Sequence, residues 1–207
     1  MGSIRVFDLN NYISKYKCET YIETGTGVCD CFSHAIKHPF KEYYSIDIDG
    51  DLISNAKQMY NDKNIHFIHN YSHIALEDIL ANIPKDQSIF FSLDAHFPGA
   101  DFHKITYEES ITQFKEDAFP LIKEIDIIKK YRNIEKDVFI IDDWFLYEPQ
   151  LDYQAHNTKN WPYRELQDQL GLVKNEDQKY ITNQFENTHD LTVDLRDQGY
   201  LIITPKK

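Results

Sequence analysis

Positive charge is scarce in this sequence of 207 residues, which holds 22 Lys and Arg against 34 Asp and Glu, for a formal net charge of −12. A field of that sign repels phosphate backbones, and no basic stripe is present to neutralise them. We therefore expect no nucleic-acid partner.

Long apolar runs are also missing. No stretch approaches the roughly 18 apolar residues that a membrane-spanning helix needs, and residues 1–8 lack the long apolar segment of a signal peptide. We expect a cytoplasmic protein that makes no membrane contact.

Cysteine, glycine and proline are all few. Cys18, Cys29 and Cys31 are odd in number and clustered, which argues against a disulfide framework and favours a reducing compartment. Cys29 and Cys31 could in principle bind a metal, but no second Cys pair exists, and packing thiols are the favoured interpretation. With seven Gly, seven Pro and 42% apolar residues, the chain is neither disordered nor fibrous, and its length predicts one domain spanning residues 1–207.

Short apolar runs alternate with stretches typical of helices. Five strand-like runs lie at residues 20–25, 42–49, 65–70, 88–96 and 137–144. Helical stretches follow the first four, at 28–38, 51–61, 71–83 and around 107–132. Such alternation indicates a parallel sheet with helices on both faces.

The end of the sequence departs from this alternation. The runs "HDLTVDLR" (189–196) and "GYLIITPK" (199–206) are separated by two residues, as in a β-hairpin. The sequence thus predicts a doubly wound α/β fold with a mostly parallel, seven-stranded sheet and a C-terminal antiparallel hairpin. Segments near 97–118 and 145–165 are interpreted as insertions.

The turn after the first strand, "YIETGTGVCDCF", is the first candidate site. Gly25 and Gly27 would let the backbone turn tightly and approach a ligand, and Glu23 could accept hydrogen bonds at the strand end. Asp47 follows Gly27 at a spacing typical of a carboxylate that binds ribose hydroxyls. The alternative is a structural turn followed by a solvated Asp.

The spacing argues against a dinucleotide. A dinucleotide loop would place a third glycine where this sequence has Asp30, and a carboxylate there would repel a pyrophosphate. With "ETGTG", "SIDID", "IHNYS" and the terminal hairpin, the sequence resembles the class I S-adenosylmethionine-dependent methyltransferases over nearly its whole length. It departs from their usual pattern at Cys29, which replaces the last glycine of the loop.

The resemblance implies a Rossmann-like methyltransferase fold and S-adenosylmethionine as cofactor. It implies that Glu23, Gly25 and Gly27 surround the methionine part of the cofactor. It also implies that Asp47 holds the ribose, and that Asn70 and Ser72 lie near the adenine.

Polar residues gather at the ends of the fourth and fifth strand-like runs, "SLDAHF" and "IIDDWF". Asp94, His96, Asp142 and Asp143 are therefore expected at the same edge of the sheet as the glycine loop. Carboxylates held close together raise one another's pKa unless a cation such as Mg²⁺ compensates them. Alternatively, Asp142 and Asp143 are a helix cap with a solvated neighbour, and His96 bonds a backbone carbonyl.

This pattern resembles the metal-dependent O-methyltransferases, including the catechol and macrolide-sugar groups. The resemblance implies Asp94, Asp142 and Asp143 as ligands of a divalent cation. We expect the cation to orient an acceptor hydroxyl while His96 or Asp94 accepts its proton.

The segment after the fifth run is rich in rings, among them Trp144, Phe145, Trp161 and Tyr163, which suit a sugar or an aromatic acceptor unless they simply pack. Lys104, Lys159 and Arg164 are candidates for binding an anionic group of the substrate. The leading hypothesis is a metal-assisted O-methyltransferase for a small hydroxylated acceptor such as a sugar or sugar-derived metabolite. A metal-dependent hydrolase or lyase, and a non-catalytic binding member of the fold, are the alternatives, and a homo-oligomer is left open.

Overall fold

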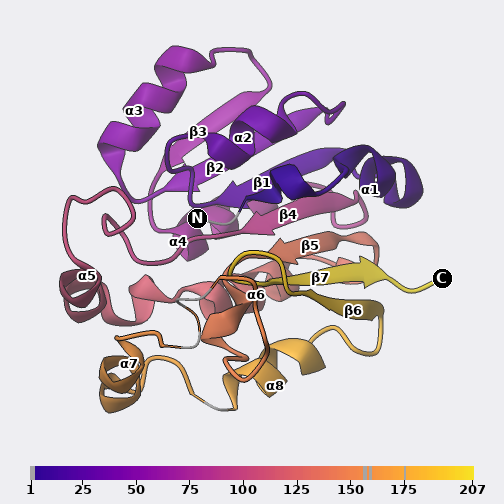
Figure 1. Ribbon diagram of the computed structural model, residues 1–207. Coiled ribbons are helices and arrows are strands. Elements are labelled where there is room, and N and C mark those ends of the chain that lie inside the picture. Colours follow the sequence, from indigo (N-terminus) through magenta and orange to yellow (C-terminus); the bar gives the residue numbers. More distant parts are fainter. Residues whose placement is uncertain (1–2, 156–157, 159, 175) are drawn as a thin grey trace.

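The computed structural model describes residues 3–155, 158, 160–174 and 176–207. These residues form one seven-stranded sheet in the order β3-β2-β1-β4-β5-β7-β6. The strands are β1 (Thr20–Thr24), β2 (Glu42–Asp47), β3 (Ile65–His69), β4 (Ile89–Leu93), β5 (Val138–Ile141), β6 (His189–Asp194) and β7 (Tyr200–Pro205). The first five strands pair in parallel, whereas β7 is antiparallel to both β5 and β6. The predicted sheet and its terminal hairpin are confirmed (Figure 1).

Helices lie between the strands. The α-helices are α1 (Leu9–Tyr16), α2 (Asp30–Ala35), α3 (Gly50–Met59), α4 (Ser72–Leu80), α5 (Tyr107–Phe114), α6 (Leu121–Tyr131), α7 (Arg164–Leu170) and α8 (Asp177–Asn183). Short 3₁₀ helices span Ile4–Val6, Lys115–Ala118, Ile134–Lys136 and Trp144–Leu146.

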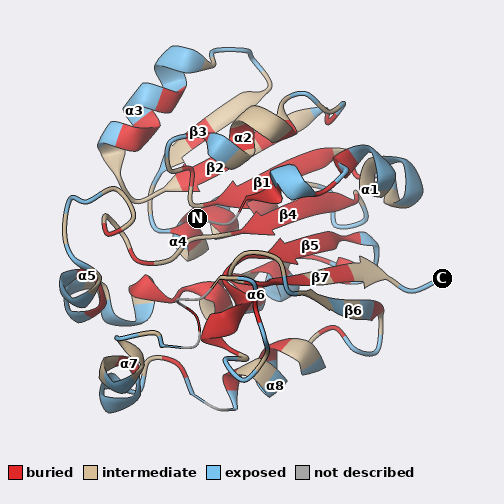
Figure 2. Ribbon diagram, in the orientation of Figure 1, coloured by how far each residue is buried: buried red, intermediate tan, exposed pale blue. Residues whose placement is uncertain are grey.

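The sheet is covered on both faces, as predicted. One core cluster packs α4, α6 and α8 against residues such as Ile22, Phe91 and Phe139, and the other packs α1, α2 and α3 against Tyr21 and Phe90. Neighbouring residues of one strand thus enter opposite cores, so β1, β4 and β5 are buried along their whole length (Figure 2).

Two features differ from the sequence prediction. The helical stretch expected around 107–132 is two helices, because the backbone turns to a positive φ at Lys115 and Pro120 stands at the start of α6. The segment between β5 and β6 also contains α7 and α8, which the apolar pattern did not reveal.

The topology places the candidate site. Strands β1, β4 and β5 all point toward the side where α5 lies (Figure 1). The sheet reverses its order between β1 and β4, the point at which open α/β sheets bind their ligands. Within the described ranges, the chain has no helix with the length and apolar character needed to cross a membrane.

Candidate functional site

The loop between β1 and α2 forms the first wall of a cavity at this reversal point. Gly25 has φ +84°, and its amide donates to the carbonyl oxygen of Ile46 at 2.8 Å. A Cβ atom at Gly25 would lie 2.4 Å from the carbonyl oxygen of Asp94, so only glycine lets this loop contact the end of β4.

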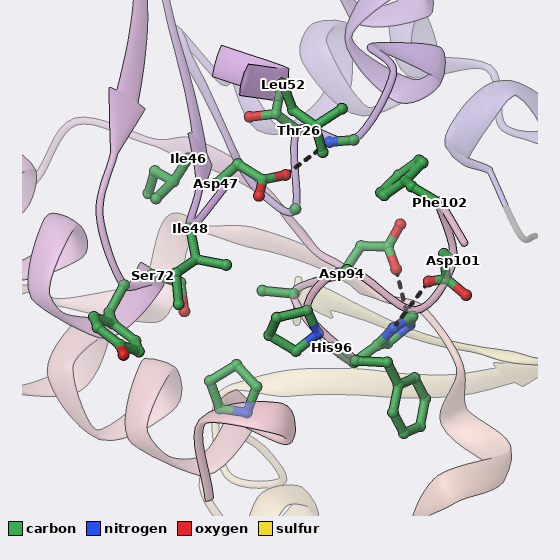
Figure 3. Close-up of a pocket in the computed structure, with 18 of the residues that line it drawn as sticks. Thr26, Ile46, Asp47, Ile48, Leu52, Ser72, Asp94, His96, Asp101 and Phe102 are labelled. Atoms are coloured by element: carbon green, nitrogen blue, oxygen red, sulfur yellow. Dashed lines mark hydrogen bonds and ion pairs between the residues drawn. The ribbon is translucent and has the colours of Figure 1, made fainter. Parts of the chain in front are cut away.

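Gly27 brings the loop to Asp47. Its amide donates to Asp47 Oδ2 at 2.9 Å (Figure 3). The Asp49 amide donates to Asp47 Oδ1 at 2.8 Å. Burial raises the pKa of Asp47, although both amide hydrogen bonds oppose the shift. The structure therefore brings together the glycine loop and the carboxylate that the sequence predicted as partners.

The far wall contains the residues predicted near the adenine. Asn70 and Ser72 line the cavity, together with the apolar side chains of Ile48 and Leu52. The Asn70 side chain accepts a hydrogen bond from the Tyr71 amide at 2.9 Å. An apolar wall with a few polar groups suits a planar base.

Glu23 lies behind the loop and does not line the cavity. Only 1% of its surface is exposed, and its oxygens accept hydrogen bonds from the Tyr21 hydroxyl at 2.7 Å and the Ser45 hydroxyl at 2.5 Å. Burial raises the pKa of Glu23 to about 8. Ser45 also bonds the Thr26 hydroxyl at 2.6 Å, so Glu23 supports the loop from within the protein, where the resemblance implied a direct cofactor contact.

The loop has a cysteine where the resemblance places a last glycine. Cys29 occupies that position with φ +67°, a left-handed conformation that usually favours glycine. All three cysteines are free thiols, in agreement with the prediction of no disulfide.

The segment after β4 closes the cavity from the other side, which the sequence analysis missed. Phe102 and Asp101 line the cavity, and a Cβ atom at Gly27 would lie 2.9 Å from the Phe102 ring. Lys104, predicted to bind a substrate anion, instead pairs with Asp49 at 2.5 Å. In the sequence, only the extra length of this segment, near residues 97–118, indicated that it could take part in the site.

At the ends of β4 and β5, His96 lies between carboxylates. Its Nε2 atom is 3.1 Å from Asp94 Oδ1 and 2.9 Å from Asp143 Oδ2, and its Nδ1 atom is 3.9 Å from Asp101 Oδ2. Figure 3 shows Asp94 and Asp101 directed toward the ring. Burial alone would lower the pKa of His96, but the two nearer carboxylates outweigh it and raise the pKa well above its ordinary value. An imidazolium can donate a proton but cannot accept one, so this geometry disfavours His96 as the base.

The predicted magnesium ligands do not form a metal site. The His96 ring stands between Asp94 and Asp143, and Asp142 Oδ1 accepts the Asp143 amide at 2.8 Å. Throughout the described part of the chain, no group of three or more His, Cys, Asp or Glu is placed to hold a metal ion. The imidazolium supplies the positive charge that the sequence analysis had assigned to a cation. The alternative of a helix cap is not borne out for Asp143, whose side chain caps nothing.

Glu124 on α6 is a further buried carboxyl group that the sequence analysis missed. It lines a small inner cavity with Asp94, His96 and Asp142, and its Oε1 atom has no hydrogen-bond partner. Burial raises the pKa of Glu124 to about 7. The burial of Glu124 could have been predicted from the sequence, because in the apolar pattern of α6 it takes a position that faces the core beside Leu121 and Ile128.

Most of the aromatic side chains after β5 pack inside the protein or against one another. Trp144 and Phe145 are fully buried, while Trp161 and Tyr163 contact each other at 5.2 Å between ring centroids. Arg164 donates to the Leu146 carbonyl at 2.8 Å, an internal contact in place of the predicted substrate contact. Lys159 lies outside the described residues.

The fold resembles those of known methyltransferases. A candidate caffeoyl-CoA O-methyltransferase from Staphylococcus aureus matches with a TM-score of 0.58 and 13% identity, over 96% of this chain and 81% of that one. The methyltransferase domain of bacterial CtHen1 matches with a TM-score of 0.51 and 10% identity, over 95% of each chain. No protein-family model and no curated protein matches the sequence. At these identities the likeness establishes the fold, and the class I methyltransferase fold implied by the sequence is confirmed.

Proposed function

We propose that this chain is an S-adenosylmethionine-dependent O-methyltransferase for a small hydroxylated acceptor such as a sugar or sugar-derived metabolite. The observation that carries the proposal is the contact of the Gly27 amide with Asp47, beside the polar groups that end β4. A glycine loop and a carboxylate in this relation fit an adenosyl group, because the carboxylate oxygens keep lone pairs for ribose hydroxyls.

The cofactor would supply an electrophilic methyl group on a sulfonium centre. Asp47 would accept the ribose hydroxyls, and the walls of the cavity would hold the acceptor oxygen in line with the methyl group. Asp94 would accept the hydroxyl proton, since burial raises its pKa and makes it a stronger base than an ordinary carboxylate. His96 would orient Asp94 through their 3.1 Å contact.

Metal assistance is left out of the proposal. The space between Asp94 and Asp143 is taken by the His96 ring, and no step requires a cation there. The acidic character of the chain disfavours nucleic acids as acceptors.

The first test is calorimetric titration of the protein with S-adenosylmethionine. We expect binding at micromolar to millimolar cofactor, and no detectable heat at millimolar concentration would reject the assignment. The second test is transfer of a labelled methyl group to a panel of sugars by the wild-type protein and Asp94→Asn. The variant should keep its cofactor affinity and lose turnover. A wild-type protein that binds the cofactor but methylates no small hydroxylated compound would be a binding member of the fold.

A further inference from the structure

A small inner cavity lies beneath the end of β4, next to the cofactor cavity. Both cavities share Asp94, Ala95 and His96 as walls. The inner cavity leaves about 20 Å³ for the centres of water-sized molecules, which is room for one such molecule. A group seated there would lie beside the carboxylate proposed to accept the proton.

The walls of the inner cavity carry three carboxyl groups and one imidazole. Of its carboxyl groups, Asp94 is already paired with the His96 ring. Glu124 and Asp142 remain, and none of the described residues that line the cavity is a Lys or Arg. Asp142 Oδ1 accepts the Asp143 amide at 2.8 Å, whereas Glu124 Oε1 has no hydrogen-bond partner.

Glu124 has one carboxyl oxygen without a hydrogen-bond partner. It is 1% exposed, and its Oε1 atom is buried without any hydrogen-bond partner. Buried polar atoms in folded proteins are almost always bonded, so an orphaned carboxylate oxygen that borders a cavity indicates a missing donor. The donor must be small, and a positive charge would compensate the carboxyl groups best.

On this basis we propose that the inner cavity binds a primary ammonium group of the acceptor, so that the substrate is an amino-bearing hydroxylated compound such as an amino sugar. An ammonium group has the size of a water molecule and three N–H donors, which suits Glu124 Oε1 and the neighbouring Asp142. Burial raises the pKa of Glu124 to about 7, and burial together with the nearby carboxylates raises the pKa of Asp142 well above its ordinary value. An ammonium group would favour the ionised forms of both side chains, which a neutral water would not. A hydrated divalent ion needs several more ligands than these walls place around it. The inference rests on the proposed function, because it names the acceptor of that same site.

The test compares three sugars by calorimetry, with and without saturating S-adenosylhomocysteine. D-Glucosamine carries the ammonium group, N-acetyl-D-glucosamine lacks its charge, and D-glucose lacks its nitrogen. We expect D-glucosamine to bind at least tenfold more tightly than either. Equal affinity for the three sugars would overturn the inference.

Two variants test whether the inner cavity causes the preference for D-glucosamine. Glu124→Gln should remove the preference for D-glucosamine, whereas Glu77→Gln, an exposed carboxyl group paired with Lys130 on the surface, should keep it. If the preference survives in Glu124→Gln, the inner cavity is not the site. Thermal unfolding of both variants shows whether each is folded.

The wild-type protein offers a test that needs no variant. Methylammonium should displace D-glucosamine, while tetramethylammonium, too large for a space of one water molecule, should not. Displacement by tetramethylammonium, or by Mg²⁺ at equal concentration, would refute an ammonium site of this size. Loss of S-adenosylhomocysteine binding with the amine preference intact would reject the methyltransferase proposal alone, whereas the reverse result would reject only the ammonium site.

Discussion

Replacement of Gly25 by alanine should damage the protein in two separable ways. The new side chain meets a positive φ of +84°, and its Cβ atom would lie 2.4 Å from the carbonyl oxygen of Asp94. The first effect costs about 1–2 kcal/mol for an L-residue in a left-handed conformation. The second forces a backbone shift, for which overpacking typically costs about 1–3 kcal/mol more. The expected total is about 2–5 kcal/mol in the free energy of unfolding.

Gly171 provides the matched control. It ends α7 with φ +65°, and a Cβ atom there would meet nothing within 4 Å. Gly171→Ala should therefore show the conformational cost alone, and the difference between the two variants measures the clash at Asp94.

The variants Gly25→Ala and Gly171→Ala also test the cofactor cavity. Because the shift in Gly25→Ala separates the glycine loop from the end of β4, we expect its affinity for S-adenosylhomocysteine to fall at least tenfold, while Gly171→Ala binds like the wild type. Urea unfolding and calorimetry give both quantities. Equal unfolding free energies for the two variants, or wild-type affinity in Gly25→Ala, would refute the reasoning.

Three further results are expected. Asp47→Asn should weaken S-adenosylhomocysteine binding by about tenfold, or about 1.4 kcal/mol, because a neutral amide is a poorer acceptor for ribose hydroxyls; unchanged calorimetric affinity would remove Asp47 from the site. Arg132→Met should lower the free energy of unfolding by about 3–5 kcal/mol, since it leaves the fully buried Asp137 without its ion-pair partner; a loss below about 1 kcal/mol in urea unfolding would contradict this. Glu23 has a pKa of about 8 in the fold, above its value in the unfolded chain, so the wild type should lose stability as pH rises from about 5 to about 8. Glu23→Gln should lack that loss, and parallel unfolding curves for the two proteins across this range would disprove the shift.

The geometry around His96 explains why the structure does not support the predicted metal site. Sequence order places Asp94 and Asp143 at the ends of neighbouring strands, and their convergence was correctly expected. Sequence order does not show which side chain occupies the space between the two carboxylates. Asp94 and His96 are only two residues apart, and the backbone beyond β4 turns the ring to within 3.1 Å of the Asp94 carboxylate. The His96 imidazolium between the two carboxylates supplies the positive charge that the predicted cation would have supplied.

For Glu23, too, the sequence predicts the position of the residue but not the direction of its side chain. It is the second-last residue of β1, so its position next to the glycine loop follows from the chain alone. Whether it faces the ligand depends on neighbours far along the sequence. The Ser45 hydroxyl on β2 donates a hydrogen bond to Glu23 Oε1, and the carboxyl group is buried beside it.

The sequence by itself determined the alternation of strands and helices, the hairpin, the glycine loop and its pairing with Asp47. These features depend on local patterns, namely apolar periodicity, turn residues and the rule that parallel strands end at one edge of the sheet. The tertiary structure decided which side chains share a space: His96 between two carboxylates, Phe102 over Gly27, and Glu124 at the inner cavity. Such contacts join segments that are separated along the chain, and they depend on side-chain orientation and excluded volume, which no local pattern encodes.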